Sequence, residues 1–166
     1  PHVITLTGTW KATEALRLSG LVRWTNWSSF DKLPISSSSL YAATSLLGRA
    51  TDKTEATYKW KDSWLFTVGA DYDINDEFTV RGGVGYEISP VDDDKYRSAT
   101  IPDTNRLWLS MGATWHASKN LQGDFGIAYL KGIGNKDLYN DKGVKVAEFD
   151  KLDAILWGAQ FVYKFD

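Results

Sequence analysis

Strict alternation of apolar and polar residues is the feature of this chain that most limits how it can fold. Residues 64–72 place Trp64, Phe66 and Val68 on one face, and the side chains between them on the other. The same period of two recurs in six further segments, residues 3–10, 16–27, 78–86, 107–115, 121–129 and 157–165. Such alternation is typical of β-strands that have one apolar face. The sequence therefore predicts seven strands.

Aromatic residues on the apolar faces are concentrated at the strand ends, whereas the middles hold aliphatic residues and glycine. One set of rings lies beside short turns or the C-terminus: Trp10, Tyr72, Phe78, Trp115, Tyr163 and Phe165. The other set lies at the opposite strand ends: Trp24, Trp64, Tyr86, Tyr129 and Trp157. Two aromatic girdles with aliphatic residues between them are typical of a transmembrane barrel. A soluble β-sandwich would instead place its largest rings in mid-strand.

Composition narrows the protein class further. A mean hydropathy of -0.33 and the lack of a long apolar run argue against a membrane-spanning helix, which needs roughly 18 apolar residues. A formal net charge of -2 gives no basic field for a nucleic acid, so we expect no nucleic-acid partner. The absence of cysteine excludes disulfides and thiolate metal sites. An aromatic content of 14% argues against disorder.

The connections alternate between short and long. Short turns fall at residues 11–15, 73–77 and 117–120, and long connections at residues 28–56, 88–105 and 131–153. Bacterial outer-membrane barrels have short periplasmic turns and long external loops. Seven strands cannot close cleanly as an antiparallel barrel, because the two edge strands would run parallel. Open edges inside lipid leave backbone groups unsatisfied. We therefore expect residues 1–166 to be part of an antiparallel transmembrane β-barrel.

Signals for catalysis or metal binding are weak. The chain has no Gly-x-Ser-x-Gly elbow, and His2 and His116 lie at chain and strand ends. The three aspartates at residues 92–94 are interpreted as a solvated loop rather than a cation site. The sequence therefore predicts no enzyme, no metal and no cofactor. The apolar stretches within residues 31–50 are consistent with a short amphipathic helix in an external loop.

The inward face of the predicted sheet carries the charges. An Arg and Asp network is expected there, made of Arg17, Arg23, Arg81, Asp71 and Asp124. Charges are tolerated at these positions because they face water or one another instead of lipid. Two interpretations stay open. The network bridges strands and holds a plug, or its positive charge attracts the carboxylate of an amphipathic ligand.

Three stretches resemble the FadL family of outer-membrane transporters for long-chain fatty acids and other hydrophobic compounds. Residues 24–30 read WTNWSSF, residues 86–91 read YEISPV, and residues 101–112 read IPDTNRLWLSMG. The family typically reads W-S-x-F, then S-P-V and I-P-D-x-D-R-x-W-L-S-x-G; here Asn105 replaces the usual Asp. The resemblance runs through the whole chain, but it covers only the C-terminal half of such a transporter.

The resemblance implies a fourteen-stranded barrel, of which the last seven strands are present. The N-terminal plug, called the hatch, and the first seven strands are absent, so an N-terminal half of the same barrel is an expected partner. The stretch around residues 59–64 is similar to a family segment in which a Lys contributes to fatty-acid binding. This implies Lys61 as an anchor for the ligand carboxylate, with Trp60, Leu65 and Trp108 lining the same apolar path.

The first functional hypothesis is therefore a channel in the bacterial outer membrane for passive uptake of long-chain fatty acids or other hydrophobic compounds. The alternative is a barrel fragment with a structural or assembly role and no transport of its own. A third hypothesis is a soluble β-sheet protein that binds hydrophobic ligands. The first two require outer-membrane lipid or detergent, and the third does not.

Overall fold

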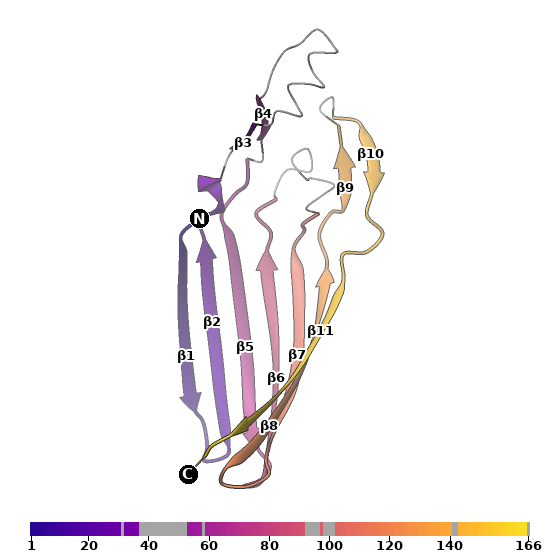
Figure 1. Ribbon diagram of the computed structural model, residues 1–166. Helices are drawn as coiled ribbons and strands as arrows, with labels where there is room; N and C mark the ends of the chain where they lie inside the picture. Colours follow the sequence, from indigo (N-terminus) through magenta and orange to yellow (C-terminus); the bar gives the residue numbers. More distant parts are fainter. Residues whose placement is uncertain are drawn as a thin grey trace.

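Seven long antiparallel strands form one curved sheet in the computed structural model (Figure 1). The structure describes residues 1–30, 59–91, 97, 102–140 and 143–165, and the backbone alone of residues 32–36 and 53–57. The seven strands are β1 (Val3–Lys11), β2 (Leu16–Thr25), β5 (Ser63–Asp73), β6 (Phe78–Ile88), β7 (Arg106–His116), β8 (Leu121–Gly132) and β11 (Ala154–Tyr163). Each pairs with the next in that order. The seven strands predicted from the alternation are confirmed.

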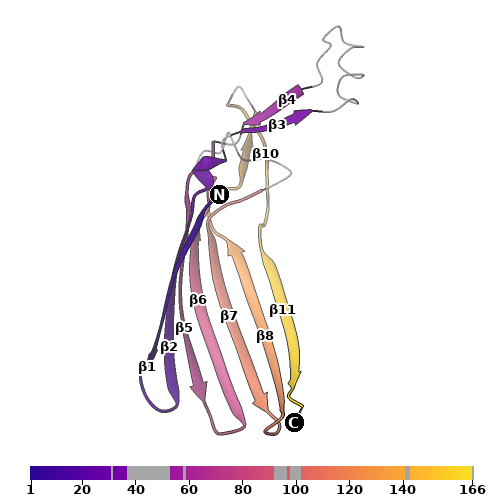
Figure 2. The same cartoon turned by 60° about the vertical axis from the view of Figure 1, so that its left-hand side comes forward.

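The sheet has one end with short turns and one end with long connections, and the chain begins at the latter and finishes at the former (Figure 1). Turned by 60°, the sheet is a curved wall from β1 to β11 (Figure 2). Local side chains form the short turns. The Asn75 side-chain oxygen accepts hydrogen bonds from the amides of Glu77 and Phe78, at 2.9 and 2.8 Å. Ser118 does the same for Asn120 and Leu121. Asn and Ser favour turns through such bonds.

Two small hairpins extend from the long-connection end and were not anticipated (Figure 1). They pair β3 (Lys32–Ser36) with β4 (Lys53–Thr57), and β9 (Asp137–Tyr139) with β10 (Lys145–Glu148). A single 3-10 turn, η1 (Trp27–Ser29), follows β2. Strands of three to five residues contain too few repeats for a period of two to stand out. Of the expected amphipathic helix, residues 32–36 are strand and residues 37–50 lie outside the described part. The described ranges contain no helix that is long and apolar enough to cross a membrane.

The register aligns the apolar faces of all seven strands into one surface. Trp24 lies opposite Trp64 near the long-connection end, and Phe78 lies opposite Trp115 beside the short turns. This surface is exposed, including Leu6 at 71%, Val68 at 62% and Trp157 at 75%. Val91 is the single hydrophobic side chain that is buried among the described residues. The sheet thus has no core of its own, and its apolar face needs lipid to cover it.

The charged residues lie on the other face. Arg81 and Val84 are three residues apart on β6, so they project to opposite sides of the sheet. Asp71 lies directly opposite Arg81, and Arg17 directly opposite Asp71. The predicted division into an apolar and a charged face is confirmed.

Strands β1 and β11 are the two edges of the sheet and do not pair with each other in the described part of the chain. The expectation of two open edges is therefore confirmed. Each edge presents backbone N–H and C=O groups without a neighbouring strand. In a bilayer these groups need a partner, because each unsatisfied group costs several kcal/mol.

The apolar surface predicts the effect of a buried charge. Replacing Val84 by Arg in the complete barrel should destabilise it by about 2–4 kcal/mol, because the charge enters the hydrocarbon layer. Replacing Ser110 by Arg, on the charged face one strand away, should cost much less. Urea unfolding in phospholipid vesicles measures both. Equal losses for the two variants would refute the assignment of the faces.

Candidate functional site

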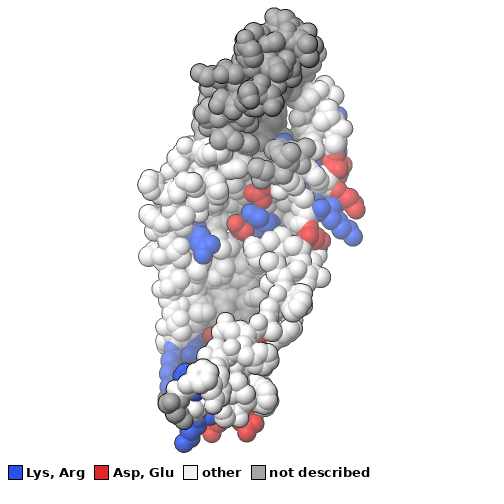
Figure 3. Space-filling view, in the orientation of Figure 1, with Lys and Arg blue, Asp and Glu red and all other residues white. Residues whose placement is uncertain are grey.

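The charged face is concave and forms a trough that is the candidate site (Figure 3). The trough runs from β2 to β11 and holds about 840 Å³. Charged side chains gather toward its two ends, with an uncharged middle between them (Figure 3). The middle is lined by small residues that are register partners: Ser19, Gly69, Gly83 and Ser110. The volume exists because these positions carry almost no side chain.

Close approach between neighbouring strands explains one of these glycines. A Cβ on Gly83 would lie 3.2 Å from the Ser110 hydroxyl and 3.2 Å from the Val68 carbonyl oxygen. Ser110 itself donates to the Gly83 carbonyl oxygen at 3.3 Å. The central band of the trough therefore stays smooth and free of large groups.

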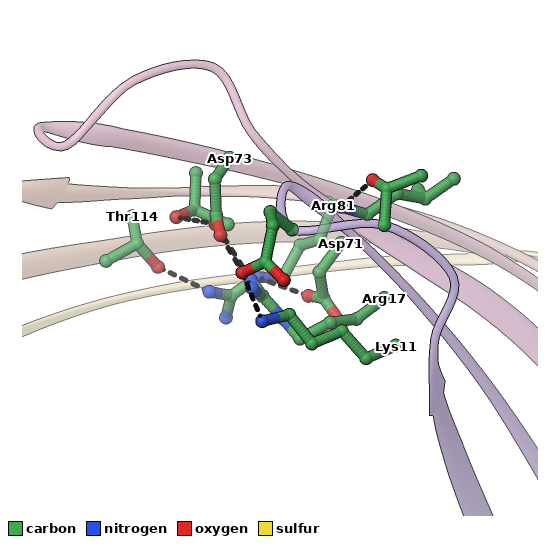
Figure 4. Close-up of polar contacts among 10 residues, drawn as sticks. Lys11, Arg17, Asp71, Asp73, Arg81 and Thr114 are labelled. Atoms are coloured by element: carbon green, nitrogen blue, oxygen red, sulfur yellow. Dashed lines mark hydrogen bonds and ion pairs between the residues drawn. The ribbon is translucent and has the colours of Figure 1, made fainter.

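Near the short turns, a network of ion pairs crosses the floor of the trough (Figure 4). Arg17 on β2 donates two hydrogen bonds to the Asp73 carboxylate on β5, at 2.6 and 2.8 Å. The Thr79 hydroxyl on β6 donates to the same carboxylate at 2.7 Å. This paired geometry of guanidinium and carboxylate is the strong form of the interaction. It ties three adjacent strands together.

Arg81 extends the network across β7. Its guanidinium pairs with Asp71 at 3.3 Å and donates to Thr114, which in turn donates to Asp124 at 2.6 Å. Thr114 is 1% exposed, so the bonds at its hydroxyl are shielded from water, whereas the Arg81 side chain is 46% exposed. Gly112 makes room for it, since a Cβ there would lie 3.1 Å from Cγ of Arg81 and 2.9 Å from the Phe125 carbonyl oxygen.

Sequence reasoning missed three members of the network. None of the three forms a pair of opposite charges with the residue directly across from it on the neighbouring strand. Asp73, Thr79 and Thr114 follow from the register, because Asp73 lies opposite Thr79 and Thr79 opposite Thr114. Alternation placed Thr79 and Thr114 on the inner face but gave no reason to choose them, and Asp73 was assigned to a short turn, whereas it is the last residue of β5. The pairing of strands supplies that reason.

At the long-connection end, a second cluster is centred on Glu87. Its carboxylate pairs with Arg106 at 3.3 Å and accepts a hydrogen bond from the Trp108 indole N–H at 3.0 Å. Leu65 lies opposite Glu87 on one side and opposite Arg23 on the other. Arg23 forms no ion pair or hydrogen bond with any described residue. Among the described residues Arg23 therefore does not join the Arg and Asp network, because Leu65 stands between it and Glu87 across the sheet.

The residues just above β5 build an aromatic and polar cluster at the mouth of the trough. Asp62 accepts hydrogen bonds from the Trp24 indole at 3.0 Å, the Asn26 amide at 3.1 Å and the Ser28 backbone N–H at 3.1 Å. The bonds from Ser28, and then those from Asn26 and Trp24, hold the pKa of Asp62 below its usual value. The WTNWS stretch is thus tied to the start of β5.

Trp60 packs edge-on against Trp27, with ring centroids 5.2 Å apart, and against Phe30 at 5.5 Å. Lys61 is exposed, and its backbone N–H donates to the Pro90 carbonyl oxygen at 2.8 Å. Leu65 and Trp108 line the trough below. The four residues predicted to share one path therefore fall into two groups, with Trp60 and Lys61 at the mouth and Leu65 and Trp108 in the wall.

Residues 89–91 and 102–106 lie in and beside the connection between β6 and β7, and hydrogen bonds join them. Asp103 accepts the Ser89 hydroxyl at 3.0 Å and pairs with Arg106 at 3.2 Å. Asn105 accepts the Ser89 N–H at 2.9 Å through its side-chain oxygen, a contact that the usual Asp would also make. Arg97 is 6% exposed and donates to the carbonyl oxygens of Asp103 and Asp137, which links this connection to β9.

Comparison with known proteins identifies the family. The model of the family described as outer membrane protein transport protein (OMPP1/FadL/TodX) matches residues 1–165. The chain belongs to this family. Its members are transport channels of the bacterial outer membrane and not enzymes. Their long connections face outward, because short turns are periplasmic in such barrels.

Relatives and solved structures agree with this assignment. The chain is 32% identical to the 47 kDa outer membrane protein of Pasteurella multocida over 163 residues, which are 96% of this chain and 34% of the relative. It is 32% identical to the long-chain fatty acid transport protein of Escherichia coli, over 86% of this chain and 28% of that one. The chain thus spans about a third of the length of these relatives.

Among solved structures, a Pseudomonas aeruginosa FadL homologue matches with a TM-score of 0.65 at 24% identity, covering 96% of this chain and 33% of that one. The toluene transporter TbuX of Ralstonia pickettii matches with a TM-score of 0.53 at 20% identity, covering 76% and 27%. Both likenesses support the barrel fold. In the described part of this chain, no group of three His, Asp or Glu side chains is placed to hold a metal ion.

Because the Arg81 side chain and the Phe125 carbonyl oxygen lie close to Gly112, a side chain at this position should lower the stability of the barrel. Replacing Gly112 by Ala should destabilise the complete barrel by about 1–3 kcal/mol, because the new methyl group displaces Arg81 and the neighbouring backbone. Gly158 is the matched control, since a Cβ there meets nothing within 4 Å. The urea midpoint should fall for the first variant only. Equal midpoints would show that Arg81 does not need this space.

The lowered pKa of Asp62 predicts acid sensitivity of the mouth. Its folded pKa lies below the unfolded value of about 3.9, so its contribution is complete above that value and is lost as the pH falls through the folded pKa. The Ser28 amide should then exchange with solvent faster at acid pH, after correction for the intrinsic rate. NMR detects this. With Asp62→Asn, the amide should show no such acid transition; the same transition in both proteins would assign it to another group.

Proposed function

We propose that the complete barrel containing this chain is an outer-membrane channel for passive uptake of long-chain fatty acids or other hydrophobic compounds. The observation that carries the proposal is the trough. It combines an apolar upper wall at Leu65 and Trp108, a smooth middle and a floor of paired charges. An amphipathic ligand needs this combination of an apolar path and a few polar groups. Family membership supports the same function.

The proposed mechanism is passive. Ligand partitions from outside into the external loops, passes the aromatic residues Trp27 and Trp60 at the mouth, and enters the trough. A plug contributed by the rest of the barrel then rearranges, and the ligand leaves into the bilayer. No covalent step is involved, and each stage depends on the balance between water, apolar protein surface and lipid.

A structural role is the second candidate. The open edges β1 and β11 favour it, because a half-barrel with two unpaired edges is suited to complete another polypeptide. Uptake of a labelled long-chain fatty acid into vesicles separates the candidates. Vesicles with the complete barrel should take up fatty acid faster than protein-free vesicles. Uptake at the protein-free rate would leave the structural role as the remaining candidate.

The proposed N-terminal half makes a prediction about the edge of the sheet. In the complete barrel, the amides of Val3–Lys11 that point away from β2 should be protected from hydrogen exchange, because a further strand accepts their hydrogen bonds. Amides of β6, which has neighbours on both sides, provide the reference. Rapid exchange confined to the outer amides of β1 would show that no strand pairs with this edge.

Lys61 is proposed as the anchor for a ligand held at the mouth, before it enters the trough, on the strength of its exposure and its place beside Trp60. Changing Lys61 to Ala should weaken fatty-acid binding by about 1.5–3 kcal/mol, the range for a hydrogen bond to a charged group. The neutral ester of the same chain length should be affected much less. Titration calorimetry of the complete barrel in detergent measures both. Equal losses for acid and ester would make Lys61 a packing or solubility element.

A further inference from the structure

The cations on the trough wall differ in whether they are paired. Arg17 pairs with Asp73, Arg81 with Asp71, and Arg106 with both Glu87 and Asp103. Arg23 lines the same trough and is exposed to it. It makes no hydrogen bond or ion pair with the described residues. Each of the other three guanidiniums already has its charge balanced by the protein.

The surroundings of Arg23 explain why no carboxylate in the described part of the chain pairs with it. Its direct neighbours across the sheet are Thr5 on β1 and Leu65 on β5, and neither carries a charge. Glu87 lies one strand beyond Leu65, and both of its carboxylate oxygens are taken by Arg106 and Trp108. Among the described residues, the guanidinium of Arg23 is thus a cation beside an apolar wall with no counter-charge directly across the sheet.

We propose that Arg23 binds the carboxylate of a fatty acid in the trough and selects acids over neutral hydrocarbons. This inference rests on the proposed uptake function and specifies its substrate class. A guanidinium forms two parallel hydrogen bonds with a carboxylate, and such bonds strengthen where apolar groups exclude water. A neutral compound would leave the Arg23 charge uncompensated and would gain only from the apolar wall.

The length of the trough fits this occupant. Arg23 and Arg17 are six residues apart on β2, which is about 20 Å at ~3.3 Å per residue. The Gly and Ser band lies between them, and the paired charges of Arg17 and Asp73 lie below. An extended acyl chain whose head group is held at Arg23 therefore lies along the smooth uncharged band and ends above the network.

The test uses the complete barrel in detergent, with oleate and methyl oleate as probes that share one tail. Titration calorimetry is applied to the wild type, Arg23→Gln and Arg23→Lys. Arg23→Gln should weaken oleate binding by at least tenfold and methyl oleate binding by less than twofold, in line with the loss of a charged hydrogen bond. Arg23→Lys keeps the charge and should recover most of the oleate affinity.

Arg81→Gln is the matched control, because it removes an equal charge from the paired network. It should lower the urea midpoint more than it changes the preference for oleate. Equal weakening of both probes by Arg23→Gln would overturn the proposal and leave the uptake function in place. A lower urea midpoint with unchanged preference would also overturn it, because Arg23 would then pair with a protein carboxylate. Failure of the wild type to bind either probe would instead refute the uptake function.

Discussion

The hydrogen-bonded register of a single sheet is the constraint on which the rest of this structure depends. The described residues contain one buried hydrophobic side chain, so no core holds the strands together. Adjacent strands hold each other through their backbone ladders, and lipid covers the apolar face. A shift of one residue between two strands would exchange the faces, placing Arg81 in the hydrocarbon and Val84 in the trough. The aromatic ends and the charged floor both follow from the same register.

The trough exists because the register aligns small side chains on the inner face of the sheet and places charged side chains at its ends. Small residues from four adjacent strands, Ser19, Gly69, Gly83 and Ser110, are register partners and leave a volume, whereas charged residues meet at the two ends. At the lower end, Arg and Asp side chains neutralise one another, which permits charge in a narrow space. At the upper end, an apolar wall faces the interior. The inner surface is therefore divided along its length by polarity, as an amphipathic ligand requires.

The described residues of the external connections are held together by their own hydrogen bonds. Residues 102–105 of the motif that leads into β7 do not line the trough, whereas Trp108 and Ser110 of the same motif do. Ser89, Asp103 and Asn105 bond to one another, and Arg97 links them to β9. Their role in the structure is to hold the loops over the end of the sheet. The aromatic residues Trp27, Phe30 and Trp60 then lie at the mouth beside Asp62, where polar bonds and ring packing define the way into the trough.

The sequence by itself determined the strands, their faces and the family. Period-two alternation over eight or more residues gives enough repeats to locate a strand, and the side of the sheet follows from parity alone. Short strands such as β9 were not predicted from the sequence, because three residues contain too few repeats of the alternation. The sequence also did not predict which charged side chains pair with one another. Only the tertiary structure decided that Arg81 reaches Thr114 over Gly112, and that Leu65 separates Arg23 from Glu87. The physical reason is that ion pairs depend on cross-strand distance, which chain spacing does not contain.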